Sequence, residues 1–174
     1  IPEQHLRSLA DGAVYHDGLN VLDPMRLKLA YYPHDVWLYL LSAQWQRIGQ
    51  EEPFVGRAGT VGDDLGSAVI AARLVRDVMR LCFLLERQYA PYAKWFGSAF
   101  ARLGCAGILT PILQGVLRAT DWQGREERLS AAYEIAAAMH NDLGITAPVP
   151  ARVSRFWGRP FWVIQGEGIA RAIW

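Results

Sequence analysis

A long amphipathic helix with arginines along one side is the feature that most constrains this chain. The pattern of apolar residues predicts this helix over residues 63–89. On a helical wheel, Arg73, Arg76, Arg80 and Arg87 fall within about 60° of arc, opposite a face of leucine, valine and methionine. The helix is therefore expected to pack by its apolar face and to hold guanidinium groups at the edge of a core. These groups need anions, which are either carboxylates of the chain or an external phosphate.

Helical patterns also fill most of the remaining sequence, and no internal repeat or domain boundary interrupts them. We expect further helices over residues 23–30, 34–52, 91–103, 106–119, 124–143 and 168–174. The glycines of residues 54–62 predict a loop, and residues 160–164 a short strand. Short apolar runs on both sides of Asp17-Gly18 predict a β-hairpin near the N-terminus. The predicted fold class is an all-α helical bundle with a small N-terminal β-hairpin, in one domain over residues 1–174.

The composition is typical of a globular domain without an overall basic field. Hydrophobic residues make up 52% of the 174 residues, charged residues make up 20%, and the formal net charge is +1. A nucleic-acid surface is therefore not expected, and any anion site must be local. No apolar run approaches the roughly 18 residues that span a bilayer, and no signal peptide opens the chain. Cys82 and Cys105 lie in apolar helical segments and are expected to be reduced, which favours a cytoplasmic location without membrane attachment.

Arg73, Arg76 and Arg80 are the candidates for binding an anion. A planar guanidinium group forms paired hydrogen bonds with phosphate or carboxylate groups. The alternative is a set of ion pairs that join helices, and the spacing alone does not decide between them. Lys94 lies in an aromatic-rich segment, residues 89–96, which could stack a base or a sugar ring or could simply pack in the core.

Four acidic residues on adjoining segments are candidates for contacting an acceptor molecule. Glu51 and Glu52 end a predicted helix, and a carboxyl group beside apolar surface has a raised pKa that suits a general base. The alternative is that they pair with arginines. Asp63 and Asp64 begin the arginine helix, where acids complement the helix dipole. At that position they would repel a phosphate and favour a cation, a hydroxyl group or an amine.

The sequence predicts no metal site and identifies no catalytic residue. The histidines and cysteines lack the spacing of metal ligands, and no nucleophile motif is present. His140 shares the apolar side of its helix with Leu129, Tyr133 and Ala136. It is therefore expected to be a hydrogen-bonded core residue.

Several strings of residues carry a resemblance to a known family. They are residues 32–37, 44–48, 61–67, 73–77, 79–83, 89–95 and 140–141. Over about residues 10–172, the sequence resembles an uncharacterised bacterial domain-of-unknown-function family found C-terminal to a nucleotidyltransferase-like domain. Because the chain begins with Ile1 rather than methionine, we expect it to be the C-terminal fragment of a longer protein of this kind.

The resemblance implies an accessory helical domain that completes a cleft and contacts the acceptor. The missing N-terminal nucleotidyltransferase-like domain would carry a Gly-Ser pair and an Asp-x-Asp pair that holds Mg²⁺ against a nucleoside triphosphate. Here Gly66-Ser67 and Gly97-Ser98 are not followed by Asp-x-Asp. We therefore expect no cofactor in this fragment and no activity of the fragment alone. The implied partners are the missing domain and a small-molecule acceptor.

The sequence leaves two other classes of function to compare with this one. A structural or oligomerisation module without a small-molecule site remains the main alternative, and it would account for seven tryptophans by a homodimer or domain interface. A helical ribonuclease module would need an arginine, then four to six intervening residues, then a histidine on one helix. Neither His34 nor His140 has one at that spacing, which argues against this class.

Overall fold

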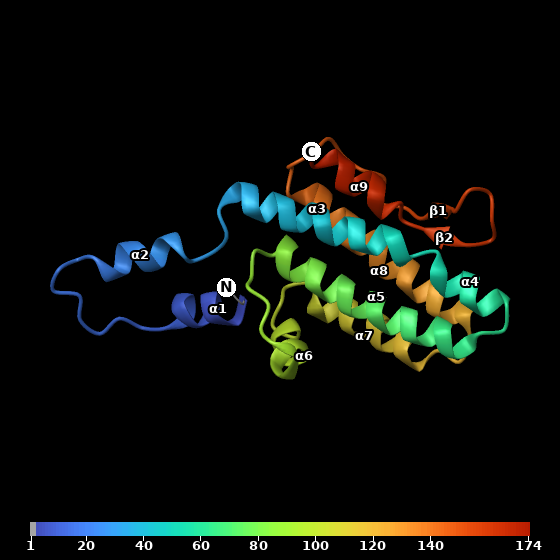
Figure 1. Ribbon diagram of the computed structural model, residues 1–174, viewed down its shortest axis with the longest axis horizontal. Helices are drawn as coiled ribbons and strands as arrows, with labels where there is room; N and C mark the ends of the chain where they lie inside the picture. Colours follow the sequence, from blue (N-terminus) through green and yellow to red (C-terminus); the bar gives the residue numbers. More distant parts are fainter. Residues whose placement is uncertain (1–2) are drawn as a thin grey trace.

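Four helices hold the core of the bundle in the computed structural model, which describes residues 3–174 (Figure 1). They are α3 (His34–Glu51), α5 (Asp64–Leu85), α7 (Ala106–Arg118) and α8 (Trp122–Asp142). The smaller elements are α1 (Glu3–Asp11), α2 (Leu22–Lys28), α4 (Phe54–Thr60), the 3₁₀ turn η1 (Ala93–Trp95), α6 (Phe96–Phe100), β1 (Ser154–Arg155), β2 (Trp162–Val163) and α9 (Gly166–Ala172). The predicted fold class, an all-α bundle with a small β-hairpin, is therefore confirmed, although the hairpin lies elsewhere.

The apolar faces of α3 and α5 form the centre of the core. On α3, Trp37, Leu41, Trp45 and Ile48 are buried at spacings of three and four residues, the period that places side chains on one helical face. The corresponding face of α5 is covered by α3, α7 and α8. Both long helices lie close to the ranges predicted from the sequence, because their periodic patterns agree with the packing.

Helix α9 packs directly against α3 through two glycines. A Cβ atom added to Gly49 would lie 2.5 Å from the backbone nitrogen of Glu167, and one added to Gly166 would lie 2.8 Å from the nitrogen of Gly49. Ser42 also donates a hydrogen bond to the carbonyl of Ala170 over 3.0 Å. The two backbones therefore touch, which only glycine allows at these positions.

The predicted N-terminal hairpin is wrong, because the turn at Asp17 leads into a helix instead of a second strand. The Asp17 carbonyl accepts the backbone N–H of Asn20 over 3.0 Å, and Asp17 also caps α2. Its carboxylate accepts hydrogen bonds from the backbone N–H groups of Val21, Leu22 and Asp23, at 3.1, 2.9 and 3.0 Å. These donors belong to the first turn of α2, which has no other side-chain cap. The hairpin of this fold is near the other end of the chain, where β1 pairs antiparallel with β2. The short strand predicted near residues 160–164 corresponds to β2.

The predicted loop over residues 54–62 is also wrong, because most of it forms α4. The glycines in α4 lower its helix propensity but allow close contact with neighbouring side chains. A Cβ atom on Gly56 would lie 2.5 Å from the Phe161 ring, and one on Gly59 would overlap Trp122. Tertiary packing therefore decides the conformation of this segment.

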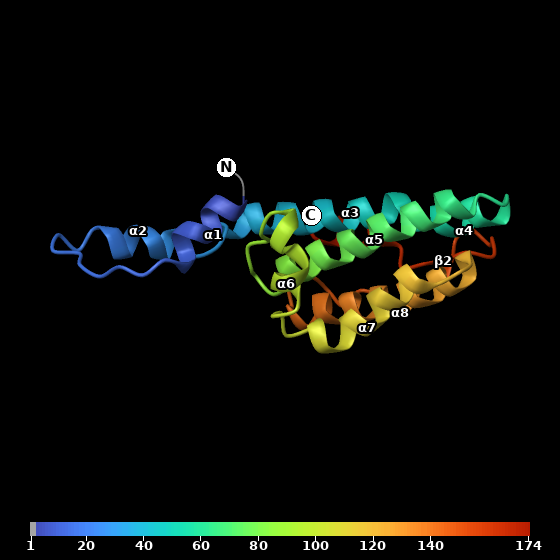
Figure 2. The same ribbon diagram turned by 90° about the horizontal axis from the view of Figure 1, so that it is seen from below.

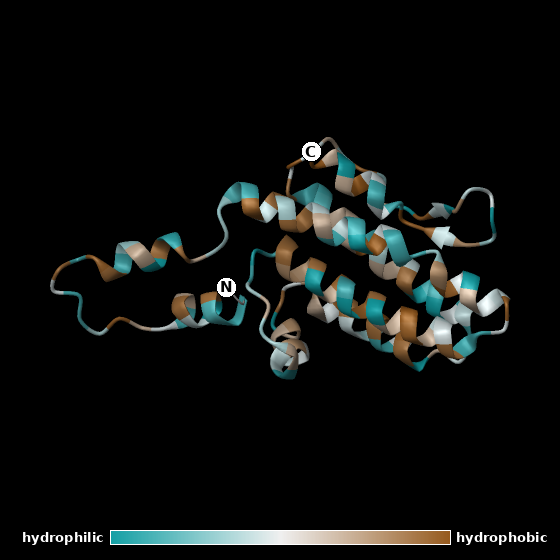
Figure 3. Ribbon diagram, viewed as in Figure 1, coloured by the Kyte–Doolittle hydropathy of each residue, from teal (hydrophilic) through white to brown (hydrophobic). Residues whose placement is uncertain are grey.

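Helix α2 and its flanking loops form an arm that projects from the bundle, and α1 lies at the base of this arm (Figures 1 and 2). Neither helix contains a buried residue, and Figure 3 shows hydrophobic positions along the arm. Tyr15, Leu19 and Leu27 are between 76% and 97% exposed. Within residues 3–174, no helix combines the length and hydrophobicity that crossing a bilayer requires.

Candidate functional site

The eight residues predicted as a site do not come together. They are Glu51, Glu52, Asp63, Asp64, Arg73, Arg76, Arg80 and Lys94. Most of them have a partner within the chain that accounts for their position, as the next paragraphs describe. Arg76 and Arg80 are different, because they border a hollow in the surface.

Arg73 belongs to a set of ion pairs between α3 and α5. Its Nη2 atom lies 2.6 Å from Oε1 of Glu51, and the same oxygen lies 3.1 Å from Nη2 of Arg47. Arg47 also approaches the carboxylate of Asp77 at 3.3 Å, and Gln44 donates to that carboxylate. For Arg73 and Glu51, the geometry therefore fits the alternative in which ion pairs join neighbouring helices.

Glu52 is the residue after α3, and it caps the beginning of α9. Its Oε2 accepts the backbone N–H of Ile164 over 2.6 Å, and its Oε1 accepts that of Gly166 over 3.0 Å. Burial raises the pKa of Glu52 to about 7, although these backbone hydrogen bonds act in the opposite direction. Since both oxygens are engaged, the geometry supports a structural acceptor rather than a general base.

Asp63 and Asp64 act at the beginning of α5. The Asp63 carboxylate accepts the backbone N–H of Gly66 over 2.7 Å, which is the geometry of a helix N-cap. Asp64 forms two contacts of 2.6 and 3.2 Å with Arg125 of α8, whose side chain is nearly buried. The hydrogen bond from Arg125 lowers the pKa of Asp64. Across residues 3–174 no group of three or more His, Cys, Asp or Glu side chains could hold a metal ion.

Lys94 is exposed on η1, apart from the arginines. Its Nζ atom lies 5.0 Å from the centroid of the Trp95 ring, as in a cation–π contact. It does not line the hollow beside Arg76 and Arg80.

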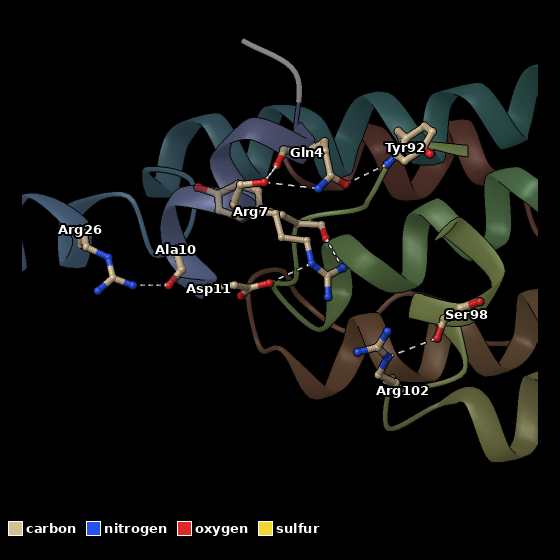
Figure 4. A network of polar contacts seen from close by, with 10 residues as sticks. Gln4, Arg7, Ala10, Asp11, Arg26, Tyr92, Ser98 and Arg102 are labelled. Carbon is tan, nitrogen blue, oxygen red and sulfur yellow. Dashed lines mark hydrogen bonds and ion pairs between the residues drawn. The ribbon is translucent and has the colours of Figure 1, made fainter. Parts of the chain in front are cut away.

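The hollow beside Arg76 and Arg80 has a volume of about 160 Å³. The two arginines are four residues apart on α5, so their side chains leave the same face of the helix. Helix α1 and residues 90–96 form the other walls. Figure 4 shows Gln4 of α1 beside Tyr92, whose backbone N–H donates to Gln4 over 3.3 Å.

Positive charge exceeds negative charge in this hollow. Among residues 3–174, the one carboxylate that Arg80 approaches is that of Glu3, with 3.5 Å between Nη2 and Oε2. Arg76 lies 6.0 Å from the centroid of the Phe96 ring, and within residues 3–174 it forms no ion pair. Two guanidinium groups therefore face one carboxylate, an arrangement suited to binding a small anion.

The sequence did not predict that α1 forms one wall of this hollow. Glu3 and Arg80 are 77 residues apart in the chain, and no pattern in the sequence indicates that α1 folds back on α5. Figure 4 shows the polar contacts that fix α1, including Arg7, which bonds to Asp11 and to the carbonyl of Tyr89. Tyr32 also donates to Glu3 over 3.1 Å. The spacing of the arginines was visible in the sequence, but the geometry of their partners was not.

The fold and the hollow define an all-α domain with a concave, arginine-lined site at the junction of α1, α5 and residues 90–96. Residues 1–96 match the family described as "Domain of unknown function (DUF4037)". Because this match covers more than half of the 174 residues, the chain belongs to this family. The matched region is shorter than the resemblance predicted from the sequence, but it contains every residue that lines the hollow. Comparison with curated proteins and with solved structures gave no match.

Proposed function

We propose that this chain is an accessory helical domain of a nucleotidyltransferase-like protein and binds an anionic group of the acceptor or the nucleotide. The observation that carries the proposal is Arg76, which borders the hollow beside Arg80 without an ion-pair partner among residues 3–174. The nucleotidyltransferase part of the proposal rests on the resemblance described above. On this proposal, Mg²⁺ and the nucleoside triphosphate bind the N-terminal catalytic domain of the parent protein, and this domain supplies part of the acceptor cleft.

The carboxylate of Glu3 competes only weakly with an incoming anion for Arg80. The contact between Arg80 and Glu3 is long at 3.5 Å, and the arginine side chain is 35% exposed. Exposed ion pairs contribute about 0–1 kcal/mol. A phosphate that forms paired hydrogen bonds with both guanidinium groups can therefore displace Glu3.

The test is a titration of the chain with pyrophosphate, followed by NMR chemical shifts and calorimetry. Arg76→Ala and Arg80→Ala are each expected to weaken binding about tenfold or more, since a hydrogen bond to a charged group contributes roughly 1.5–3 kcal/mol. Arg118→Ala is the matched control, because Arg118 is an exposed arginine at the end of α7. Equal affinity in all four proteins would contradict the anion site. Citrate and ATP, titrated in parallel, distinguish a carboxylate acceptor from a nucleotide.

The arm supports the second candidate, an oligomerisation module. In the part of the chain that the structure describes, the apolar residues of α2 and its flanking loops are exposed, and an apolar cleft lies between Val75, Phe100 and Leu113. A second copy could receive the arm in that cleft. Light scattering of the full chain tests this candidate, with Leu19→Glu and Leu27→Glu as variants. A dimer that both variants dissociate supports it, and a monomer at high concentration rules it out.

A further inference from the structure

A second cavity lies where the loop of the β1–β2 hairpin meets the beginnings of α4 and α9 (Figure 1). Its volume of about 490 Å³ falls within the range of roughly 300–1,000 Å³ typical of small-molecule sites. Arg57 lines it from α4, Phe156 and Trp157 line it from the hairpin loop, and Glu167 and Arg171 line it from α9. The fold therefore builds this cavity from segments more than a hundred residues apart.

Trp157 is an exposed aromatic residue in an unfavourable backbone conformation. It is 87% exposed although it lines the cavity. The carbonyl of Phe156 accepts the backbone N–H of Arg159 over 2.8 Å, and φ is 49° at Trp157 and 74° at Gly158. A turn with positive φ at both central residues favours asparagine or glycine at the first of them, and a bulky residue there is strained. Neither core packing nor turn formation explains a tryptophan at this position.

Gln165 is a second strained residue in the same lining. Its φ is 60°, and among residues 3–174 four residues other than glycine have a positive φ, of which Trp157 and Gln165 are two. Glu52 fixes this conformation, because its carboxyl group accepts the N–H groups of Ile164 and Gly166 on both sides of Gln165. Residues held in such conformations gather at ligand sites. Two of them in one lining therefore favour a binding site over a plain recess.

The charged side chains that line the cavity are not engaged with each other. Arg57, Glu167 and Arg171 are exposed, and within residues 3–174 none of them forms an ion pair. Glu167 and Arg171 are four residues apart on α9, a spacing at which opposite charges can pair. The guanidinium of Arg57 lies over the ring of Phe54, another lining residue, 5.2 Å from its centroid. Two guanidinium groups are therefore available to an anion in the cavity.

The carboxyl groups of the lining leave an excess of positive charge. Glu52 borders the cavity, but both of its oxygens accept backbone N–H groups, and burial raises its pKa to about 7. At pH 6 its side chain is therefore mostly protonated. Among the lining residues, Glu167 is then the one carboxylate that opposes Arg57 and Arg171.

We infer that this cavity binds an anionic group, phosphate or carboxylate, that is attached to a flat ring. The ring stacks on Trp157, and the anion accepts hydrogen bonds from Arg57 and Arg171. Aromatic side chains stack flat rings of many kinds, and guanidinium groups suit both phosphate and carboxylate. The site is separate from the hollow at Arg76, so either can exist without the other.

Two pairs of probes separate the anion from the ring. AMP and adenosine differ by a phosphate, and benzoate and benzamide differ by the charge of one group. The full chain is titrated with each probe at pH 6 while the indole N–H signal of Trp157 is followed by NMR. In at least one pair, the charged member should bind with a dissociation constant on the order of 1 mM or lower, about tenfold more tightly than the neutral member.

The pair that shows this preference distinguishes a phosphate ligand from a carboxylate ligand. The inference is overturned if neither charged probe shifts the Trp157 signal. It is also overturned if neither pair shows a preference for its charged member.

Trp157→Asn tests the ring without weakening the turn, since asparagine before glycine favours a turn of this type. The variant should keep or raise the melting temperature and, by calorimetry, bind the preferred probe about tenfold more weakly. Trp174→Asn is the matched control, because Trp174 is 81% exposed and does not line the cavity. It should change the affinity less than about twofold. Unchanged affinity in a folded Trp157→Asn protein contradicts the site.

Arginine substitutions locate the anion. Arg57→Gln and Arg171→Gln should each weaken binding of the preferred probe about tenfold. Arg159→Gln is the matched control, since Arg159 is an exposed arginine of the hairpin that does not line the cavity. Equal losses in all three variants would show that general positive charge is responsible, and the inference fails. Arg76→Ala should leave the affinity unchanged, whereas a loss as large as that of Arg57→Gln would assign the probe to the other hollow and contradict this site.

Discussion

Oε1 of Glu52, the residue after α3, accepts the backbone N–H of Gly166 at the beginning of α9, over 3.0 Å and 114 residues of sequence. The first N–H groups of a helix have no partner within the helix. Gln165, the residue before α9, supplies no side-chain cap of its own. A carboxyl group from the residue after α3 therefore completes the beginning of α9, which explains why an acidic side chain occupies a buried position.

Glu52→Gln is expected to lower the free energy of unfolding by about 1–3 kcal/mol at pH 5, because the amide places an N–H group against a backbone donor. Denaturant unfolding measures the change. Glu167→Gln is the matched control, since Glu167 is exposed on α9 and should change stability by less than about 0.5 kcal/mol. An unchanged midpoint for Glu52→Gln would contradict the capping role.

The stability difference between the wild type and Glu52→Gln should also depend on pH. The folded state keeps the proton of Glu52 up to about pH 7, whereas the unfolded state releases it near the ordinary value of 4.5. The contribution of Glu52 is therefore fully present below pH 4.5 and declines as the pH rises towards 7. The wild-type advantage should narrow by up to about 3 kcal/mol over this range. An advantage that stays constant or grows with pH would show that the pKa is not raised.

His140 should produce the opposite pH dependence. Its Nδ1 accepts a hydrogen bond from Trp45 Nε1 over 3.3 Å, its Nε2 lies 3.2 Å from Thr146 Oγ, and burial lowers its pKa from 6.5. The neutral imidazole is favoured in the folded state. Its contribution is therefore complete above pH 6.5 and is lost as the pH falls through the lower folded pKa. An NMR titration of the imidazole should give a midpoint below 6.5, and a midpoint above that value would refute the lowered pKa.

Gly49→Ala should destabilise the protein by about 2 kcal/mol or more, because the new methyl group meets the backbone of α9. Gly107→Ala is the control within a helix. A Cβ atom at Gly107 meets no other atom within 4 Å, so this change should be neutral or stabilise the protein by up to about 1 kcal/mol. Thermal unfolding of the two variants tests the direct contact between α3 and α9. Equal effects of the two changes would rule that contact out.

The pair formed by Asp64 and Arg125 can be tested with a double-mutant cycle. Asp64→Asn removes the carboxylate and leaves the nearly buried guanidinium of Arg125 uncompensated. Arg125→Met removes the charge that needs compensation. Asp64→Asn should therefore lower the melting temperature more in the wild type than in the Arg125→Met background. Identical effects in both backgrounds would show that the two side chains are not coupled.

The long helices could be predicted from sequence because local pattern and tertiary packing agree in them. Asp17-Gly18 forms the turn that its local signal predicts. The hairpin prediction fails because strand pairing depends on more than the turn, and Asp17 caps the following helix through three N–H groups. Residues 54–62 were misread because glycine usually weakens a helix. In α4, Gly56 and Gly59 instead make room for Phe161 and Trp122, which lie far away in the sequence.

In the candidate sites, too, local patterns could be predicted from the sequence, whereas long-range contacts could not. The arginine spacing on α5 is a property of one helix and could be read directly. Whether each arginine has a partner depends on α1 and α3, so Arg73 and Arg76 could not be distinguished beforehand. The spacing of Glu167 and Arg171 was equally visible, but only the position of the hairpin shows that these residues line a cavity with Trp157.

The contact between α3 and α9 has a consequence for the order of folding. Gly49, Ser42 and Glu52 meet partners that are synthesised more than a hundred residues later. Contacts at such sequence separation form only after the entropy of closing a long loop has been overcome, which slows folding. On the ribosome, the face of α3 that receives α9 must remain uncovered while α4 to α8 are made. During synthesis, this face is therefore the part of the nascent bundle most in need of protection from other chains.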